Sequence, residues 1–122
     1  MKRNLLRYSF VVFYTVAGIM HFIQPDVYLE VIPDWMCYKS LINYTAGFVE
    51  LLVAVMACFK LSQQLASYIT IAMLLAFTIS HIYFIQMGSC AGDFCIPEWI
   101  AWIRLIVIHP LLIWWAWKIR KA

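Results

Sequence analysis

Long apolar runs separated by short polar segments dominate the pattern of this chain. Four such runs cover residues 5–23, 41–59, 65–87 and 99–117. Each has the ~17 to 25 residues that an α-helix needs to cross the hydrocarbon of a bilayer. The runs are too long for barrel strands and lack their alternation, and a helix satisfies its own backbone in lipid. The pattern therefore predicts an all-α bundle of four transmembrane helices.

The composition points to the same class of protein. Of the 122 residues, 66% are hydrophobic and 12% are charged, whereas soluble domains average about half apolar and a quarter charged residues. Four spans of roughly 20 residues use most of the chain, so we expect one membrane domain over residues 1–122. No cleavage site follows the first run, so we expect it to remain in the mature protein. The lipid bilayer is the first expected partner.

Charged residues divide between the predicted loops by sign. Seven of the nine bases lie at one end of the predicted bundle: Lys2, Arg3, Arg7, Lys60, Lys118, Arg120 and Lys121. Five of the six acids lie in the two opposite loops: Asp26, Glu30, Asp34, Asp93 and Glu98. The positive-inside rule then predicts that both termini are cytoplasmic. We expect the membrane to be a bacterial inner membrane. Because this topology explains the net charge of +3, we expect no nucleic-acid partner.

The longer of the two outer loops covers residues 24–40. Its apolar and aromatic positions keep a helical spacing from Val27 to Trp35, with Asp26 placed to cap the helix and Pro33 placed to break it. We predict a short interfacial helix whose aromatic side chains anchor it among the lipid headgroups. The alternative is a lid over a site that opens outward.

An ionisable residue inside a span adds at least ~2.5 to 3.5 kcal/mol to the free energy of membrane insertion. We therefore expect Glu50 and Arg104 to face the bundle interior and to have polar partners there. Small and polar residues recur on one face of the second span, and the first span repeats the pattern with Tyr14, Gly18 and His21. The face of the second span consists of Asn43, Gly47, Glu50, Ala54 and Ala57. The depths of the side chains predict a polar pocket in the outer half, lined by His21, Asn43, Glu50, His81 and Arg104.

This polar set has three interpretations. A buried Glu50–Arg104 pair that sets the helix register is favoured, ahead of a ligand or quinone pocket and of proton handling. Three histidines on three spans also suggest haem, but His21, His81 and His109 differ by at least ~6 Å in predicted depth. Two axial ligands must meet one iron, so haem is not favoured.

The four cysteines divide by topology. Cys58 lies near the cytoplasmic end of the second span, whereas Cys37, Cys90 and Cys95 are in the outer loops. A local Cys90–Cys95 disulfide is sterically allowed across Gly92, and Cys37 is an equally legal partner. The four-residue spacing is unlike a zinc knuckle, so we predict no metal site. A structural disulfide with a leftover thiol is favoured over a relay in which the third thiol attacks the pair.

Three segments carry a resemblance to a known family. AGIMHF at residues 17–22, YTAGFVEL at 44–51 and WIRL at 102–105, with Pro25, Tyr28 and the Ile32-Pro33 pair, resemble the DoxX-like integral membrane proteins. The resemblance covers nearly the whole chain. It implies a compact four-helix bundle whose recurrent intramembrane polar set is His21, Gly47, Glu50 and Arg104. The chain departs from the family at residues 79–84, where an Asn-containing segment is expected, and in its Cys90 and Cys95 loop.

The resemblance implies a link to redox systems, because such families include subunits of thiosulfate to quinone oxidoreductases and maturation factors for disulfide-containing enzymes. Animal relatives act as chaperones for membrane receptors. We expect an accessory or assembly subunit of a larger membrane complex, not an enzyme on its own, whose partner is another membrane protein or a second copy. The alternative is a redox-associated protein that exchanges electrons between its outer thiols and a quinone, the one cofactor that this alternative requires. A solute transporter is less favoured, because the spans show no repeated halves.

Overall fold

The computed structural model describes residues 2–91 and 94–121. Its helices and strands run in the order α1 (Lys2–Ile23), α2 (Pro25–Leu29), α3 (Lys39–Ala57), α4 (Gln63–Gln86), β1 (Cys90–Ala91), β2 (Phe94–Cys95), α5 (Glu98–Ile103), η1 (Arg104–Ile108) and α6 (His109–Ile119). The element η1 is a turn of π-helix that joins α5 and α6 into one long helix. Gly92 and Asp93, which the sequence assigns to an outer loop, lie outside the described residues.

Four helices of the described chain are long and apolar enough to cross a membrane. They are α1, α3, α4 and the joined α5–η1–α6, and each coincides with a predicted span to within a few residues. The prediction of a helical fold with four long apolar helices, each of a length that could cross a membrane, is therefore confirmed. The one addition is a hairpin between α4 and α5, in which β1 pairs antiparallel with β2.

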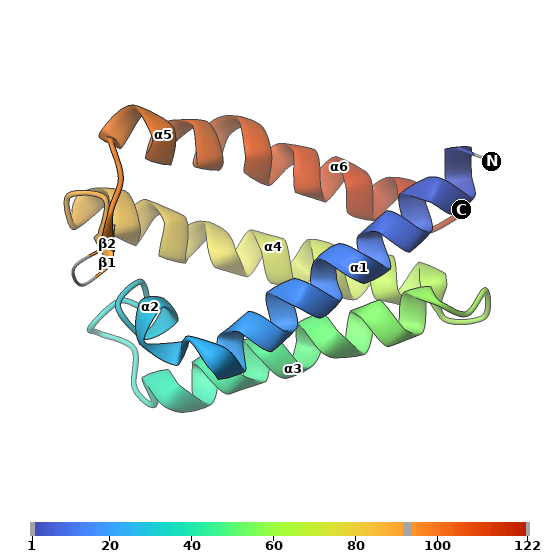
Figure 1. Ribbon diagram of the computed structural model, residues 1–122, viewed down its shortest axis with the longest axis horizontal. Helices are drawn as coiled ribbons and strands as arrows, with labels where there is room; N and C mark the ends of the chain where they lie inside the picture. The colour runs from blue at the N-terminus through green and yellow to red at the C-terminus, as the bar shows by residue number, and fades with distance from the viewer. Residues whose placement is uncertain (1, 92–93, 122) are drawn as a thin grey trace.

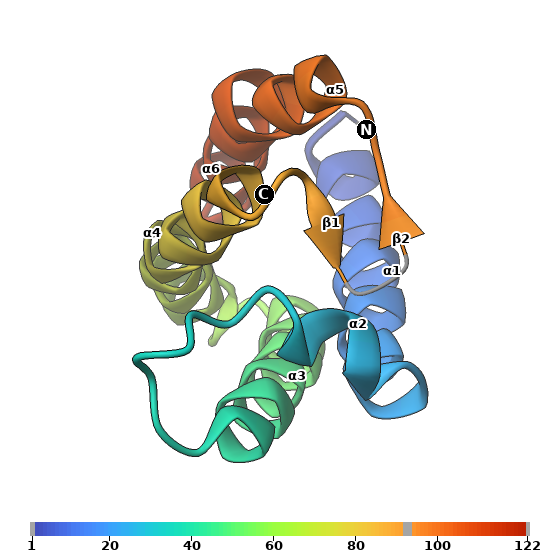
Figure 2. The same cartoon turned by 90° about the vertical axis from the view of Figure 1, so that its left-hand side faces the viewer.

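The four long helices form a ring in which neighbours in sequence are neighbours in space. Helix α1 packs against α3 and α6, and α4 packs against the same two helices on the other side. Both chain termini and the α3–α4 connection lie at one end, the terminal end, whereas α2 and the hairpin lie at the other, the α2 end (Figure 1). Helix α1 runs obliquely, beside α3 at the α2 end and closer to α6 at the terminal end (Figures 1 and 2). This tilt opens the bundle at the α2 end.

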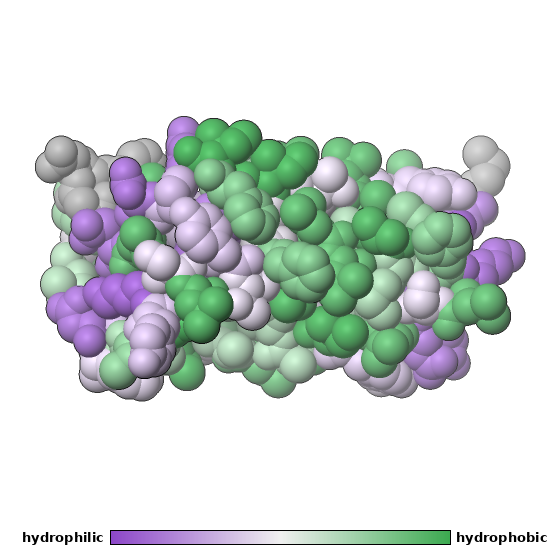
Figure 3. Space-filling model, turned by 90° about the horizontal axis from the view of Figure 1, so that it is seen from below, coloured by the Kyte–Doolittle hydropathy of each residue, from purple (hydrophilic) through white to green (hydrophobic). Residues whose placement is uncertain are grey.

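The surface shows where lipid would cover the protein. On the face seen in Figure 3, side chains in the middle of the bundle are mostly hydrophobic, and hydrophilic residues gather toward the two ends. Val12, Val55, Leu75 and Ile106, one from each long helix, are all more than half exposed. Such apolar exposure is unfavourable in water and favourable against lipid chains.

The terminal half of the bundle is closely packed. Phe10, Val53 and Ala116 are fully buried there, and the indole of Trp115 donates a hydrogen bond to the Leu6 carbonyl at 2.9 Å. Arg7, which the charge pattern places before the first span, is part of α1 and buried. Its Nη1 donates to Oε1 of Gln63 at 2.9 Å, across the diagonal from α1 to α4. The bundle is thus held together by polar as well as apolar contacts at this end.

Two glycines let α1 and α3 cross closely. A Cβ atom added at Gly18 would lie 2.8 Å from Cγ of Leu51, and one added at Gly47 would lie 2.7 Å from Cβ of His21. Small residues at such a crossing allow two backbones to approach in a membrane protein. The predicted interior faces are confirmed, since Tyr14, Gly18 and His21 on α1 are buried. So are Asn43, Gly47, Glu50, Ala54 and Ala57 on α3.

The short helix of the first loop is present but differs in its bounds. Helix α2 is five residues long, from Pro25 to Leu29, and Gln24 rather than Asp26 occupies its N-cap position. Proline suits the first helical position because its missing N–H would be unpaired there and its φ angle is already helical. The helix ends before Pro33, which is buried. The predicted cap at Asp26 is therefore wrong by two residues.

Candidate functional site: a polar cavity at the α2 end

A cavity of about 340 Å³ lies inside the α2 half of the bundle. All five residues that the sequence assigns to a polar pocket line it: His21, Asn43, Glu50, His81 and Arg104. Most of the remaining lining is apolar. Tyr28, Val31, Ile32 and Met36 contribute to it from α2 and the loop that follows, so this segment covers the cavity as well as connecting two spans.

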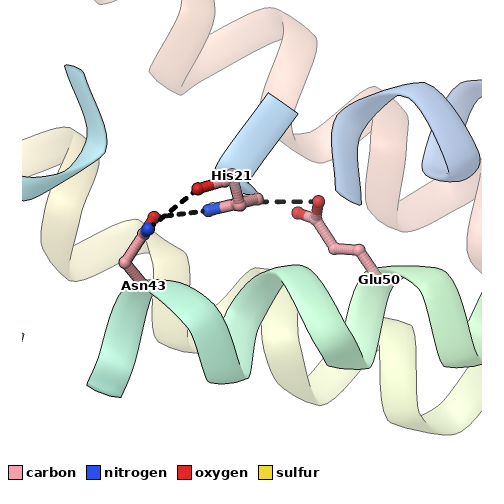
Figure 4. Close-up of polar contacts among 3 residues, drawn as sticks. All are labelled: His21, Asn43 and Glu50. Atoms are coloured by element: carbon pink, nitrogen blue, oxygen red, sulfur yellow. Dashed lines mark hydrogen bonds and ion pairs between the residues drawn. The ribbon is translucent and has the colours of Figure 1, made fainter. Parts of the chain in front are cut away.

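His21 connects α1 to two polar side chains of α3 (Figure 4). Its Nδ1 lies 2.8 Å from Oδ1 of Asn43, whose Nδ2 donates in turn to the His21 carbonyl at 3.0 Å. This reciprocal pair makes Nδ1 the donor and turns Nε2 toward Glu50, where it lies 3.4 Å from Oε2. Both side chains are buried, and a buried ionisable group inside a membrane span needs a partner of this kind.

Tyr28 ties α2 to the same wall of the cavity. Its ring stacks on the His21 imidazole, with ring centroids 3.9 Å apart and planes inclined by 23°. Burial, and then the nearby Glu50 carboxyl group, raise the pKa of the Tyr28 phenol, and Arg104 partly opposes them. The phenol is therefore neutral near pH 7 and offers a hydroxyl group rather than a charge.

The opposite wall carries Arg104 and His81. Nη2 of Arg104 lies 3.4 Å from Nδ1 of His81, and the guanidinium group lies 5.2 Å from the centre of the Phe84 ring. A guanidinium group can only donate, so Nδ1 of His81 accepts and its Nε2 carries the ring hydrogen. His81 also touches His109 edge to face, at 4.8 Å between ring centroids. This wall therefore presents N–H donors and a positive charge.

The π-helical turn η1 places Arg104 and His109 on one face. The backbone N–H of His109 donates to the carbonyl of Arg104, five residues earlier. Pro110 has no N–H to donate to the carbonyl of Ile106, and its ring would clash with that group in a regular α-helix. The extra residue in the turn relieves the clash, and Nε2 of His109 reaches the Leu74 carbonyl at 2.5 Å. The sequence prediction missed this turn, although a proline inside a span was the signal for it.

The expected direct pair between Glu50 and Arg104 is wrong. Among the residues that the structure describes, the ion pairs within 4.0 Å are His21–Glu50 and Lys39–Asp34. The reason lies in the order of helices around the ring, because α3 and the last helix occupy diagonal positions. Glu50 and Arg104 consequently face each other across the cavity, and each has a histidine as its partner.

His81 and His109 lie closer together than their positions along the helices predict. His81 and His109 were expected at least ~6 Å apart along the membrane normal, but their ring centroids are 4.8 Å apart. Helical side chains lean toward the N-terminus of their own helix, so those on antiparallel helices can converge from different depths. Rings in edge-to-face contact leave no space for an iron between them. Within the described ranges, no group of three His, Cys, Asp or Glu side chains could hold a metal ion.

The cysteines of the described residues are not part of the cavity lining. Cys90 and Cys95 form a disulfide across the β1–β2 hairpin, which selects one of the three pairings that the sequence left open among Cys37, Cys90 and Cys95. Cys37 and Cys58 are free and exposed, the first in the loop after α2 and the second just after α3. No cysteine is among the described residues that line the cavity.

Fold and cavity together define a small four-span membrane protein with a partly polar chamber in one half of its bundle. The chain belongs to a family described as a domain of unknown function, DUF8561, whose model matches residues 10–120. Comparisons with curated proteins and with solved structures give no match.

Proposed function

We propose that this chain is a DoxX-like protein of a bacterial inner membrane that serves as an accessory or assembly subunit of a larger membrane complex. We propose that the chain itself catalyses no reaction. The termini and the α3–α4 connection face the cytoplasm, and α2 lies at the outer surface as an interfacial segment. The distribution of bases supports this orientation, because Lys60, Lys118 and Arg120 all belong to the terminal end.

The observation that carries the proposal is the separation of the two chemically active features. The Cys90–Cys95 disulfide is in the hairpin, and the cavity is lined by other residues. The polar groups of the cavity are engaged in pairs between helices, namely His21 with Glu50 and Arg104 with His81. Such pairs hold helices in register, which suits a protein that acts through its shape and surface.

The joined helix α5–η1–α6 offers a face for a partner. Four of its indole side chains are more than two-fifths exposed: Trp99, Trp102, Trp114 and Trp117. Tryptophan is enriched both at membrane interfaces and at the centres of protein interfaces. A partner helix packed on this face would cover the indoles that lie within the hydrocarbon region.

The test is native electrophoresis of membranes solubilised in a mild detergent. We expect the wild-type chain to migrate in a complex larger than the purified protein, and a W102A/W114A variant to lose that complex. The matched control is V12A/V16A, which truncates two exposed side chains on α1. A wild-type chain that migrates only at the size of the purified protein contradicts the proposal, as does an unchanged complex in the tryptophan variant. If cross-linking of the complex gives products whose masses are multiples of the mass of this chain, the partner is a second copy.

A redox role is the second candidate, and it is favoured by the Cys90–Cys95 disulfide and the free thiol of Cys37, which belong to the same end of the bundle. Oxidation of Cys90 and Cys95 from dithiol to disulfide would release two electrons and two protons, which a quinone would take up to become a quinol. Acid-quenched thiol trapping in intact cells tests it. Cycling of the pair between its two states, or a mixed disulfide through Cys37, would replace the accessory role. A pair that stays oxidised under reductant and oxidant stress removes this candidate.

A further inference from the structure

Arg104 has no carboxylate within 4.0 Å among the described side chains, whose ion pairs at that distance are His21–Glu50 and Lys39–Asp34. Its nearest polar partner is the neutral nitrogen Nδ1 of His81. Glu50, the carboxyl group on the opposite wall, is paired with His21 instead, with 3.4 Å between Nε2 and Oε2. The phenol of Tyr28 is neutral. A guanidinium group inside a membrane span without a counter-charge is costly, so an anion in the cavity would be stabilised.

The cavity borders a groove on the apolar surface of the bundle. This second hollow, about 560 Å³ and open, lies between α3 and α4 and is lined almost entirely by apolar groups. Ile42 and Ala46 line both the cavity and the groove. Helices α3 and α4 spread apart from their connection toward the α2 end, which separates the two helices where the cavity lies (Figures 1 and 2). A polar chamber and an apolar groove therefore meet at one side of the bundle.

We propose that this combined site binds a single-chain amphiphile with a carboxylate head, the chemistry of a fatty acid. The carboxylate lies in the cavity against Arg104 and His81, and the hydrocarbon chain leaves past Ile42 and Ala46 into the groove. This binding site does not depend on the accessory role, and the two proposals are tested separately.

The donor geometry of the wall selects a carboxylate. A guanidinium fork matches the two oxygens of a carboxylate with parallel hydrogen bonds, which are stronger than neutral ones. His81 accepts from the guanidinium group through its Nδ1 and so helps to hold that group in place at the cavity wall. Phe84 supports the guanidinium group through its ring face and excludes water from that side. The apolar groove accepts a chain from the bilayer without passage through water.

The experiment uses the full chain in nanodiscs of phosphatidylcholine, with a 16-carbon fatty acid that carries a photoreactive diazirine in its chain. After irradiation, mass spectrometry locates the labelled residues. We expect labels on α3 and α4 along the groove, and we expect palmitate to suppress them. Methyl palmitate, which has the same chain and no charge, should compete at least tenfold less well.

Three variants separate the head site from general lipid contact. R104Q should weaken competition by palmitate about tenfold or more, because charge-assisted hydrogen bonds are lost. K118Q removes an exposed cation of α6 that does not line the cavity, and it should bind as the wild type does. A46L should block the junction of cavity and groove and lower labelling without any change of charge. If R104Q fails to give a monodisperse protein, R104K and A46L carry the test.

Several outcomes overturn the proposal. Equal competition by palmitate and its methyl ester would show that the groove binds chains without recognition of the head. Unchanged binding in both R104Q and R104K would contradict the assigned contacts. If neither arginine variant folds, unchanged binding in A46L would contradict them. Displacement of the probe by decylubiquinone but not by palmitate would make the ligand a neutral quinone. None of these results bears on whether a protein partner binds elsewhere.

Discussion

Gly47 of α3 lies so close to α1 that a Cβ atom at this position would be 2.7 Å from Cβ of His21. The absence of a side chain here sets the separation of the two helices. That separation in turn brings the imidazole of His21 to Asn43 and Glu50. A residue with no chemistry of its own thus positions the polar wall of the cavity.

Substitution of Gly47 by alanine should separate α1 from α3. The added methyl group overlaps His21 and lies 2.9 Å from the ring of Phe22, so backbone as well as side chain must move. We expect a loss of roughly 1 to 3 kcal/mol in the free energy of unfolding, as for other overpacked sites. Unfolding in detergent measures it, with V12L on the exposed face of α1 as the control. A G47A protein as stable as the wild type would show that the crossing is loose.

Asn43 should be coupled energetically to His21. Replacement of Asn43 by alanine leaves the His21 carbonyl and Nδ1 without their partners and should cost about 1 to 3 kcal/mol of stability. Once His21 is alanine, the same N43A change should cost less, with an interaction energy of 0.5 kcal/mol or more. A double-mutant cycle measures this difference. Additive single effects would mean that the reciprocal pair does not form in the membrane.

Pro110 should determine the orientation of His109. In P110A the N–H returns, a regular α-helical turn can replace η1, and His109 would rotate by roughly 100° relative to Arg104. The hydrogen bond from Nε2 of His109 to the Leu74 carbonyl would then be lost. Nitrogen NMR of labelled imidazole groups detects the change, and P110G, which also restores the N–H, is the companion variant. Identical His109 signals in all three proteins would show that packing, not proline, causes the turn.

The free thiols should report the orientation in the membrane. Cys37 at the α2 end and Cys58 at the terminal end are both exposed, and Cys90 and Cys95 are joined in a disulfide. In intact spheroplasts, an impermeant maleimide should label Cys37, and Cys58 should react only after the membrane is permeabilised. C37S and C58S identify each product by mass. The reverse order of labelling would invert the proposed topology.

Much of the architecture follows from the sequence because its determinants are local. The length of each apolar run predicted four spans, and the spacing of Asn43, Gly47 and Glu50 identified the interior face of α3. Helical periodicity and hydrocarbon thickness act within one segment, so neither needs knowledge of the neighbours. The five polar residues that line the cavity were predicted for the same reason, from their depth and face.

Only the tertiary structure decided which polar groups are partners. Glu50 pairs with His21 rather than Arg104 because α1 is adjacent to α3 while the last helix is diagonal to it. His81 meets His109 because side chains on antiparallel helices lean toward each other and a π-turn adds one residue. Depth and helical face are properties of a single helix, whereas a contact depends on the order, tilt and register of two helices, which are set by packing across the whole bundle.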